Sequence, residues 1–477
     1  MRVNPTYIVL LSLLVTSCAL GPNYIRPPMS VPVKFKEAPS GWKYAEPKDQ
    51  LSRGEWWTIF NDTKLNELEA QVNLHNQNIE NALYNYQNAR ALVKEDQASY
   101  LPSITTSLNL NRQQRSSSAF SSGTGGGGVV TTGGTNTTPF DTQNLVVNAS
   151  WVPDLWGTVR RTVEGQIAAT QASAALLGNT QLSSQSLLAQ NYFQLRGLDL
   201  DQKILNDTVV EYKKALKLTQ YRYASGVAAR GDVIQAQSQL ESAQALAINN
   251  GIQRAQYEHA IAVLIGVPPA NFSLEFQPIN AKPPAIPVEI PSQVLERRPD
   301  IAQAERLIAQ ANAQIGIAEA AYFPSLTLNA QGNRNGLGSI ATWLANPLYS
   351  WTAGATLAAT LFDGGYRDAA VKAAEASYRA SVANYRQVVL TAFQNVEDNL
   401  VSLRILGAES EVQNRAAADA LKSLAIITNQ YKSGIVPFTS VIVAQNTAFT
   451  AQKTAADVMY LRMVSSVQFI ASIGGGW

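Results

Sequence analysis

The stretch SITTSLNLN at residues 103–111 alternates apolar and polar side chains with a period of two. Ile104, Leu108 and Leu110 fall on one face, and the other face holds only Ser, Thr and Asn. This period predicts a β-strand with two unlike faces. An uncharged polar face suits the water-filled interior of a membrane barrel, although a half-buried strand of a soluble sheet would alternate in the same way.

Three further stretches show the same alternation, at residues 144–151, 325–331 and 351–361. Their lengths of 8, 7 and 11 residues come close to the 9–11 residues that a tilted transmembrane strand needs. Four strands cannot close a barrel, because about eight are needed before side chains fit inside. We therefore expect several copies of the chain to share one barrel.

The chain contains an internal duplication. The motif YLPS at residues 100–103 recurs as YFPS at 322–325, and YASGV at 223–227 recurs as YKSGI at 431–435. The first copy carries a Ser/Thr/Gly tract at 116–138 where the second has only residues 332–347, so we expect a loop that is longer in the first copy. The predicted organisation is a signal peptide (1–17), an acylated N-terminal extended segment (18–62), a first repeat (63–282), a connector (283–292) and a second repeat (293–477).

Between the strands, apolar residues recur every three or four positions, which predicts amphipathic helices. No proline interrupts residues 155–223 or 366–431, so each stretch predicts a helix approaching ~100 Å. The following helices, expected at 233–264 and 441–473, would pack against them as coiled-coil partners. Gly226 and Gly434 are expected at the turns, since glycine tolerates positive φ, and Gly197 and Gly407 at places where the long helices bend or thicken.

The N-terminus has the features of a secretory signal that ends in a lipobox. Arg2 precedes an apolar run, and Val15-Thr16-Ser17 leads directly into Cys18. Cleavage before Cys18 would expose an N-terminal cysteine for acyl chains such as palmitate, and several chains together anchor durably. No later run of about 20 apolar residues predicts a transmembrane helix, so a membrane span would have to be a barrel.

Composition argues against most other functions. The chain has 37 basic and 35 acidic residues, a net charge of +2 that disfavours nucleic acid as a partner. Cys18 is the sole cysteine, and His75 and His259 lie far apart, so we expect no metal site. No phosphate-binding loop or catalytic triad is recognisable, and we expect no catalytic residue and no cofactor.

Five features in order resemble the TolC-like outer membrane factors, in their lipoprotein efflux branch. They are the lipobox followed by Gly21-Pro22-Asn23-Tyr24, Trp56-Trp57, Arg298-Pro299-Asp300-Ile301, the two Tyr-x-x-Gly turns and the terminal Gly474-Gly475-Gly476-Trp477. The resemblance implies an α+β membrane protein, a homotrimer whose chains give four strands each to a 12-stranded β-barrel. A long α-helical coiled-coil periplasmic tunnel with an equatorial belt would continue the barrel. From the residues alone, Asp300 is expected at a helix start and Trp56-Trp57 in packing.

The resemblance also implies a periplasmic gate at the two turns. Tyr223, Tyr431 and Asp232 match gate positions of the family, whereas Val443 stands where many relatives carry an aspartate. We therefore expect a more apolar constriction formed by Thr439 and Val443. Asp232 is expected either to latch the gate through Arg222, Arg230 and Lys432 or to cap its own helix. The tip turns at Gly226 and Gly434 are the expected adaptor contacts.

The expected function is that of an outer-membrane exit duct of a tripartite efflux system. It would passively conduct small toxic compounds from a periplasmic adaptor and an inner-membrane transporter to the exterior, lipid-anchored in the bacterial outer membrane. A type I protein-secretion duct of the same family remains an alternative. A trimeric coiled-coil adhesin and a soluble periplasmic binding protein are further alternatives, but strands placed between helices within each repeat favour a tunnel.

Overall fold

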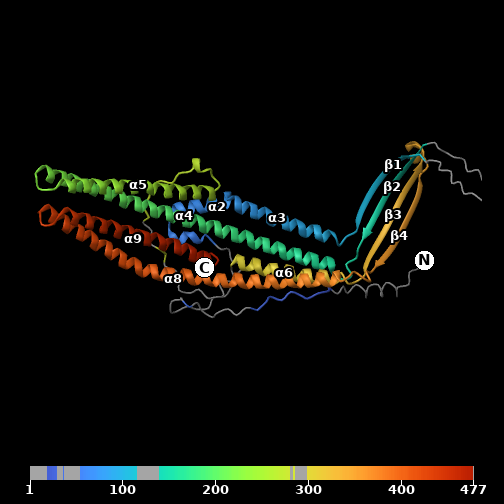
Figure 1. Ribbon diagram of the computed structural model, residues 1–477. Coiled ribbons are helices and arrows are strands. Elements are labelled where there is room, and N and C mark those ends of the chain that lie inside the picture. The colour runs from blue at the N-terminus through green and yellow to red at the C-terminus, as the bar shows by residue number, and fades with distance from the viewer. Residues whose placement is uncertain are drawn as a thin grey trace, which may run out of the picture. The chain divides into compact units, whose positions relative to one another are not determined.

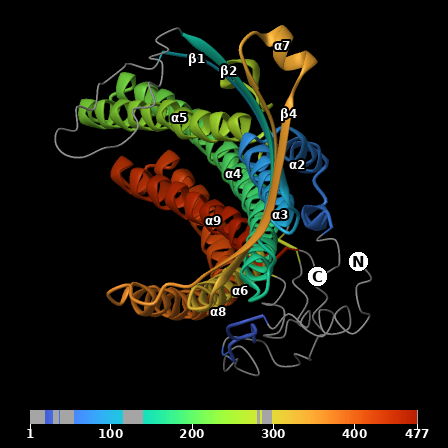
Figure 2. The ribbon, with the colours of Figure 1, turned by 90° about the vertical axis from the view of Figure 1, so that its right-hand side faces the viewer.

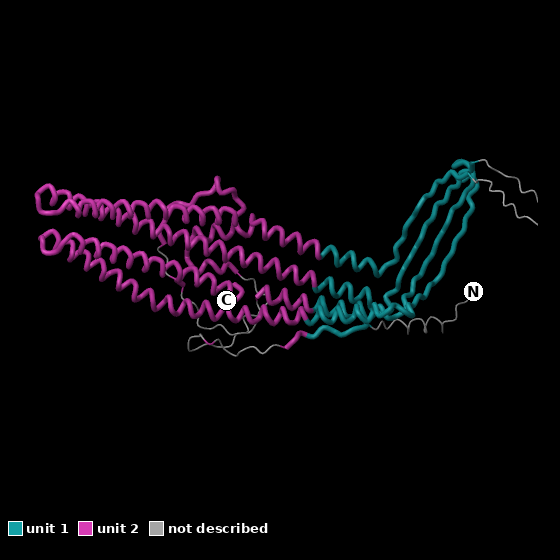
Figure 3. Tube along the Cα trace, viewed as in Figure 1, with its two compact units in different colours: residues 1–25, 90–168, 309–379 teal, residues 26–89, 169–308, 380–477 magenta. Residues whose placement is uncertain are grey.

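The computed structural model describes residues 19–28, 36, 54–114, 139–279, 283–284 and 298–475. Cys18 with the predicted signal peptide, the tract 116–138 and most of the predicted connector lie outside these ranges. The chain forms two compact units (Figure 3). Unit 1 comprises residues 1–25, 90–168 and 309–379, and unit 2 comprises residues 26–89, 169–308 and 380–477. Each unit therefore combines segments from both predicted repeats.

Unit 1 contains a four-stranded antiparallel sheet in the order β1-β2-β3-β4 (Figure 1). The strands are β1 (Ser103–Gln113), β2 (Phe140–Trp151), β3 (Ser325–Leu337) and β4 (Leu348–Ala358). All four lie where the alternation predicts them. The last strand ends at Ala358 and not at the expected Leu361, because Ala358 pairs with Ser325, the first residue of β3, and residues beyond it have no partner in that strand.

The register confirms that the sheet has two unlike faces. One row across the four strands joins hydrogen-bonding side chains: Thr105, Asn148, Gln331 and Thr352. The adjacent row, which points to the opposite face, joins apolar side chains: Ile104, Ala149, Ala330 and Ala353. The pairing thus places most uncharged polar positions of the four strands on a common face, although Val146 also lies on it and Thr106 and Arg334 lie on the other.

The connection between β3 and β4 differs from the expected loop at 332–347. Residues up to Leu337 extend β3, and a short helix α7 (Ile340–Ala345) follows. Trp343 of α7 packs where Gly336 leaves room, and its Nε1 donates to the carbonyl oxygen of Arg334 at 3.2 Å. The Arg334 guanidinium lies 4.9 Å from the centre of the Trp343 ring. Glycines interrupt the apolar alternation here, which is why the pattern predicts a loop.

Helices account for most of unit 2. The four longest helices of the described chain are α4 (Thr158–Ala224), α5 (Arg230–Leu264), α8 (Tyr366–Lys432) and α9 (Phe438–Ser472). In unit 2, α5 returns beside α4 and α9 returns beside α8 (Figures 1 and 2). The two long helices and their returning partners confirm the prediction from periodicity. None of the helices within the described ranges combines the length and apolar character needed to cross a bilayer.

The expected bends at Gly197 and Gly407 do not interrupt either helix. Both α4 and α8 continue through these positions. At Gly197 the absent side chain admits the ring of Tyr460 from α9, so this glycine serves close helix packing. At Gly407 no neighbouring atom lies within 4 Å of the position that a Cβ would take.

Shorter elements pack against the helices of unit 2. They are η1 (Trp56–Phe60), α2 (Thr63–His75), η2 (Pro269–Asn271), and parts of α3 (Gln77–Ala98) and α6 (Pro299–Ala320). Trp56 and Trp57 are 4% and 3% exposed and belong to the main apolar core, which confirms the packing prediction. Asp300 lies in the first turn of α6, as expected, and accepts two hydrogen bonds from Arg298. Arg298 also donates to the Ser472 carbonyl at 2.8 Å, which ties α6 to the end of α9.

Candidate functional site

Two turns of nearly identical geometry join the long helices of unit 2 at its helix tips. Gly226 and Gly434 have φ of 74° and 77°, a left-handed conformation that glycine adopts without steric strain. Val227 N–H donates to the Arg222 carbonyl at 2.8 Å, and Ile435 N–H donates to the Gln430 carbonyl at 2.9 Å. These bonds close the helix ends in the manner of a Schellman motif. Both glycines therefore occupy the turns that the repeat predicts.

Arg222 connects the two tips within one chain. Its Nη1 donates to the Tyr431 carbonyl at 2.5 Å and to the Lys432 carbonyl at 3.2 Å. The guanidinium also lies 4.5 Å from the centre of the Tyr431 ring. A cation at these last carbonyls satisfies acceptors that have no partner inside α8 and complements the negative end of the helix dipole. The sequence offers Arg222 as one of three cations that could meet Asp232 around a threefold axis, and within the chain Arg222 binds the end of α8.

The two tip tyrosines occupy different environments. Tyr431 is 4% exposed and packs against Phe438 with ring centres 5.4 Å apart, whereas Tyr223 is 48% exposed. The Tyr431 hydroxyl has no hydrogen-bond partner in the described part of the chain. The position equivalent to Phe438 in the first tip is Arg230, so the first tip lacks an aromatic ring at this position. This difference between the copies is the sequence signal that would have separated the two tyrosines.

Asp232 lies partly exposed in the first turn of α5. The N-cap of that helix is Ala229, and its side chain makes no capping hydrogen bond. Among the described residues, the Asp232 carboxylate forms no ion pair with Arg222, Arg230 or Lys432 of the same chain. An acid near a helix N-terminus is favourable by itself, and here the carboxylate stays open to a group from outside the chain.

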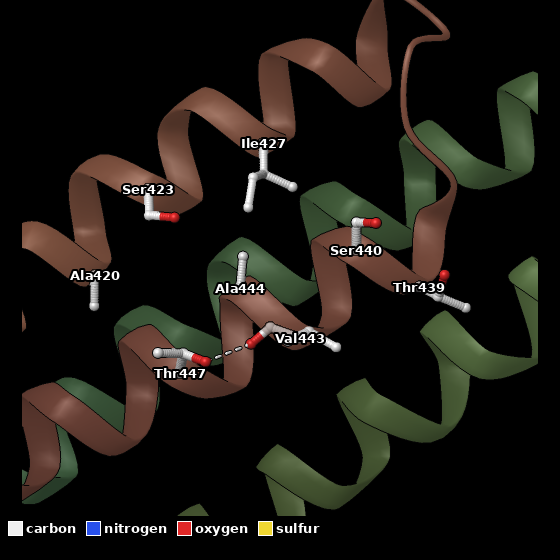
Figure 4. Close-up of a pocket in the computed structure, with 8 residues that line it drawn as sticks. All are labelled: Ala420, Ser423, Ile427, Thr439, Ser440, Val443, Ala444 and Thr447. Carbon is white, nitrogen blue, oxygen red and sulfur yellow. Dashed lines mark hydrogen bonds between the residues drawn. The ribbon is translucent and has the colours of Figure 1, made fainter.

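Thr439 and Val443 line a groove of about 360 Å³ between α8 and α9, close to the second tip. Figure 4 shows Ile427 of α8 pointing toward Ala444 of α9 across this groove. The remaining lining residues are small or carry hydroxyls: Ala420, Ser423, Ser440 and Thr447. Val443 is 66% exposed, and Thr439 is also exposed. The lining is uncharged and shallow, a surface on which another helix can pack closely.

A charge cluster around the buried Asp201, which the sequence did not indicate, links α4 to α9. Asp201 is 3% exposed, and its Oδ2 lies 3.3 Å from Lys453 Nζ. Lys453 also pairs with Asp457 at 3.0 Å, one turn along α9. Burial raises the pKa of Asp201 to about 6, against the opposing effect of the Lys453 ammonium. In sequence Lys453 and Asp457 look like an ordinary surface pair at i,i+4, so nothing pointed to a third member.

The sequence is similar to that of known proteins over most of its length. The model of the family described as outer membrane efflux protein matches residues 69–267 and 290–475. The chain is 28% identical over 448 residues to the pyoverdine export outer membrane protein OpmQ of Pseudomonas aeruginosa, covering 92% of this chain and 91% of the relative. It is 26% identical over 473 residues to the cation efflux system protein CusC of Escherichia coli, covering 98% and 97%.

Solved structures share the fold over nearly the whole chain. The outer-membrane channel OprN matches with a TM-score of 0.83 at 25% identity and covers 96% of this chain and 100% of the other. The Campylobacter jejuni CmeC outer membrane channel matches with a TM-score of 0.85 at 22% identity, covering 96% and 95%. The sheet and the paired long helices are thus common to this chain and to both channels.

Proposed function

Because the chain belongs to the outer membrane efflux protein family, we propose that it forms the exit duct of a tripartite efflux system. The family resemblance seen in the sequence is confirmed, and the chain is an outer-membrane efflux channel. The observation that carries the finer proposal is the pair of unlike faces on a sheet of only four strands. Such a sheet needs sister copies to close around water, and three chains give an even count of 12 strands.

The lining of the sheet supports passive conduction. Its polar face presents Ser, Thr, Asn and Gln, as in the row Thr105, Asn148, Gln331 and Thr352. Uncharged groups neither attract nor repel a charged solute strongly, so the duct itself would select little. The names of the relatives fit this view, since they refer to pyoverdine, cations and toluene. Small toxic compounds would be chosen by an inner-membrane transporter.

The tips are the proposed docking place for a periplasmic adaptor. The turns at Gly226 and Gly434 end the two helix pairs, and the groove beside Thr439 and Val443 is lined by small side chains. Small residues let helix backbones approach closely, which suits an adaptor made of helices. The same tips would form the gate, with Tyr223, Asp232 and Tyr431 contributing polar contacts and Thr439 and Val443 an apolar constriction.

Acylation of Cys18 belongs to the same proposal. The support is the Val15-Thr16-Ser17-Cys18 sequence at the end of an apolar run. Mass spectrometry of the mature N-terminus should find acyl chains on Cys18. An unmodified thiol at that position would contradict the anchor and leave the channel itself unaffected.

Deletion of the gene tests the efflux function. Cells without the channel should become several-fold more susceptible to small toxic compounds, and a plasmid copy should restore resistance. Unchanged susceptibility, together with the loss of a secreted protein from the culture medium, would contradict efflux and favour a protein-secretion duct.

A further inference from the structure

The buried side chain of Arg161, in the first turns of α4, binds the beginning of the described chain. Arg161 is 2% exposed. Its Nε donates to the Leu20 carbonyl at 2.9 Å, and its Nη2 donates to the Gly21 carbonyl at 3.0 Å and to Asn23 Oδ1 at 3.1 Å. The remaining Nη1 pairs with Glu164 at 2.7 Å. A buried guanidinium thus directs three hydrogen bonds to three residues of an extended segment: Leu20, Gly21 and Asn23.

Glycines allow this segment to lie directly on the helices of unit 1. A Cβ on Gly316 of α6 would come within 2.7 Å of the Leu20 carbonyl oxygen. A Cβ on Gly157 would come within 2.8 Å of the Ala19 Cα. Asn312 of α6 adds a hydrogen bond of 2.7 Å to the Pro22 carbonyl. Gly157, Arg161, Asn312 and Gly316 together form what we name the N-terminal seat.

The N-terminal seat adjoins the aromatic end of the sheet. Leu20 N–H donates to the Trp156 carbonyl at 3.3 Å. The Trp156 indole donates to the Pro324 carbonyl at 2.7 Å, and its ring stacks on Phe323 with centres 4.9 Å apart. These residues follow β2 and precede β3 in the chain. Aromatic rings at strand ends typically lie at the membrane–water interface.

We propose that the N-terminal seat fixes the point at which the acyl chains of Cys18 enter the membrane. Cys18 directly precedes Ala19, the first residue packed on the seat, so seating of residues 19–23 would limit how far an acylated Cys18 can lie from it. The seat would hold the anchor level with the interfacial rings of Trp156 and Phe323. This inference about the lipid rests on the proposed acylation of Cys18. The hydrogen bonds of Arg161 to residues 20, 21 and 23 are independent of acylation.

Limited chymotrypsin digestion of the full-length, detergent-extracted protein tests the seat. Cleavage after Tyr24 requires local release of the neighbouring residues, so seating should protect this bond. Arg161→Ala should release the fragment 18–24 at least about tenfold faster, since it removes several charge-assisted hydrogen bonds. Gly316→Ala should do the same by displacing Leu20, while alanine leaves α6 a good helix.

Two matched variants serve as controls. Gly407→Ala adds a methyl group where no neighbour lies within 4 Å, and Arg379→Ala removes an arginine that is exposed on α8. Both should release the fragment at the unmodified protein's rate. Equal rates in Arg161→Ala, Gly316→Ala and the controls would overturn the seat. The mass of the fragment reports acylation separately, so a fast fragment without acyl chains would support the seat and contradict the proposed anchor.

Discussion

Arg222 shows how one side chain can join the tips of the two repeats. It bonds the last carbonyls of α8 and covers the Tyr431 ring, and a charge-assisted hydrogen bond contributes about 1.5–3 kcal/mol. Arg222→Ala should therefore fray the second tip. We expect amide hydrogen exchange at Ser433, Gly434 and Ile435 to become about tenfold faster, which corresponds to about 1.4 kcal/mol.

The matched control for Arg222 is Arg230→Ala, because Arg230 is exposed at the start of α5 and forms no ion pair with the described residues of the second tip. In Arg230→Ala, the rates of amide hydrogen exchange at residues 433–435 should equal those of the unmodified protein. Equal protection in both variants would show that Arg222 does not hold the end of α8.

Asp201 predicts a pH dependence of stability. Burial raises its pKa in the folded protein to about 6, compared with about 3.9 in an unfolded chain. A raised carboxyl pKa means that the folded state binds the proton more tightly, so stability from this group is full below about pH 4 and is lost as pH rises through about 6. Asp201→Asn cannot ionise, and its melting temperature relative to the unmodified protein should increase between pH 5 and pH 8.

Thermal unfolding in detergent across that pH range measures the effect. Asp207→Asn, on the same helix but exposed, is the control and should shift little with pH. A difference between Asp201→Asn and the unmodified protein that stays constant from pH 5 to pH 8 would contradict the assignment.

At the scale of single residues, the sequence predicted where a residue lies along its helix or turn better than it predicted the burial and contacts of the side chain. The repeat placed Gly226 and Gly434 at the turns, because only a turn needs glycine at that point of the pattern. The repeat also made Tyr223 and Tyr431 look equivalent. They differ because Phe438, the first residue of α9, packs on the Tyr431 ring. The roles of Arg161 and Asp201 could not be predicted, because their partners are distant in sequence.

At the scale of elements, periodicity was sufficient for strands and helices that repeat it without interruption. The four strands and four long helices are confirmed because each keeps one period over many residues. The prediction of a loop at 332–347 was wrong for the end of β3. Gly332, Gly336 and Gly338 break the side-chain alternation there, while the backbone of β3 still pairs with β2 up to Leu337. Strand pairing depends on backbone hydrogen bonds with neighbours, which a side-chain pattern does not report.

The glycines of the long helices provide a paired test of helix packing. Gly407→Ala should stabilise the protein by up to about 1 kcal/mol, since alanine is the better helix former and the site is open. Gly197→Ala should destabilise it by about 1–3 kcal/mol, because the new methyl group meets the Tyr460 ring. Melting temperatures of the two variants should therefore move in opposite directions. A stabilised Gly197→Ala variant would show that α4 and α9 do not need this close approach.

At the scale of the whole molecule, the number of strands determines the assembly that we expect. Four strands per chain require sharing, and the proposed trimer gives 12. Light scattering corrected for bound detergent should yield a protein mass close to three times that of one mature chain. A monomer or dimer that retains its sheet would reject the shared barrel.

The proposed gate follows from that trimer and from the environment of Asp232. Since this carboxylate has no ion-pair partner among the described residues of its own chain, any contribution to closure must come from contacts between chains. Asp232→Asn keeps the shape of the side chain and removes its charge, which should weaken such contacts by about 1.5–3 kcal/mol each. We expect a higher conductance of the purified trimer in planar bilayers and entry of bulky antibiotics that the unmodified channel excludes.

Tyr431→Ala, which would be expected to add to this effect, is the poorer test, because removing a buried ring also disrupts packing against Phe438. Tyr223→Phe is the better companion, since Tyr223 is half exposed and loses only its hydroxyl. Asp207→Asn again controls for the loss of one carboxylate from the helices. If Asp232→Asn conducts like the control in a variant shown to be trimeric, the carboxylate only favours the start of α5. The constriction formed by Thr439 and Val443 would then close the channel, and Val443→Ala should raise the conductance instead.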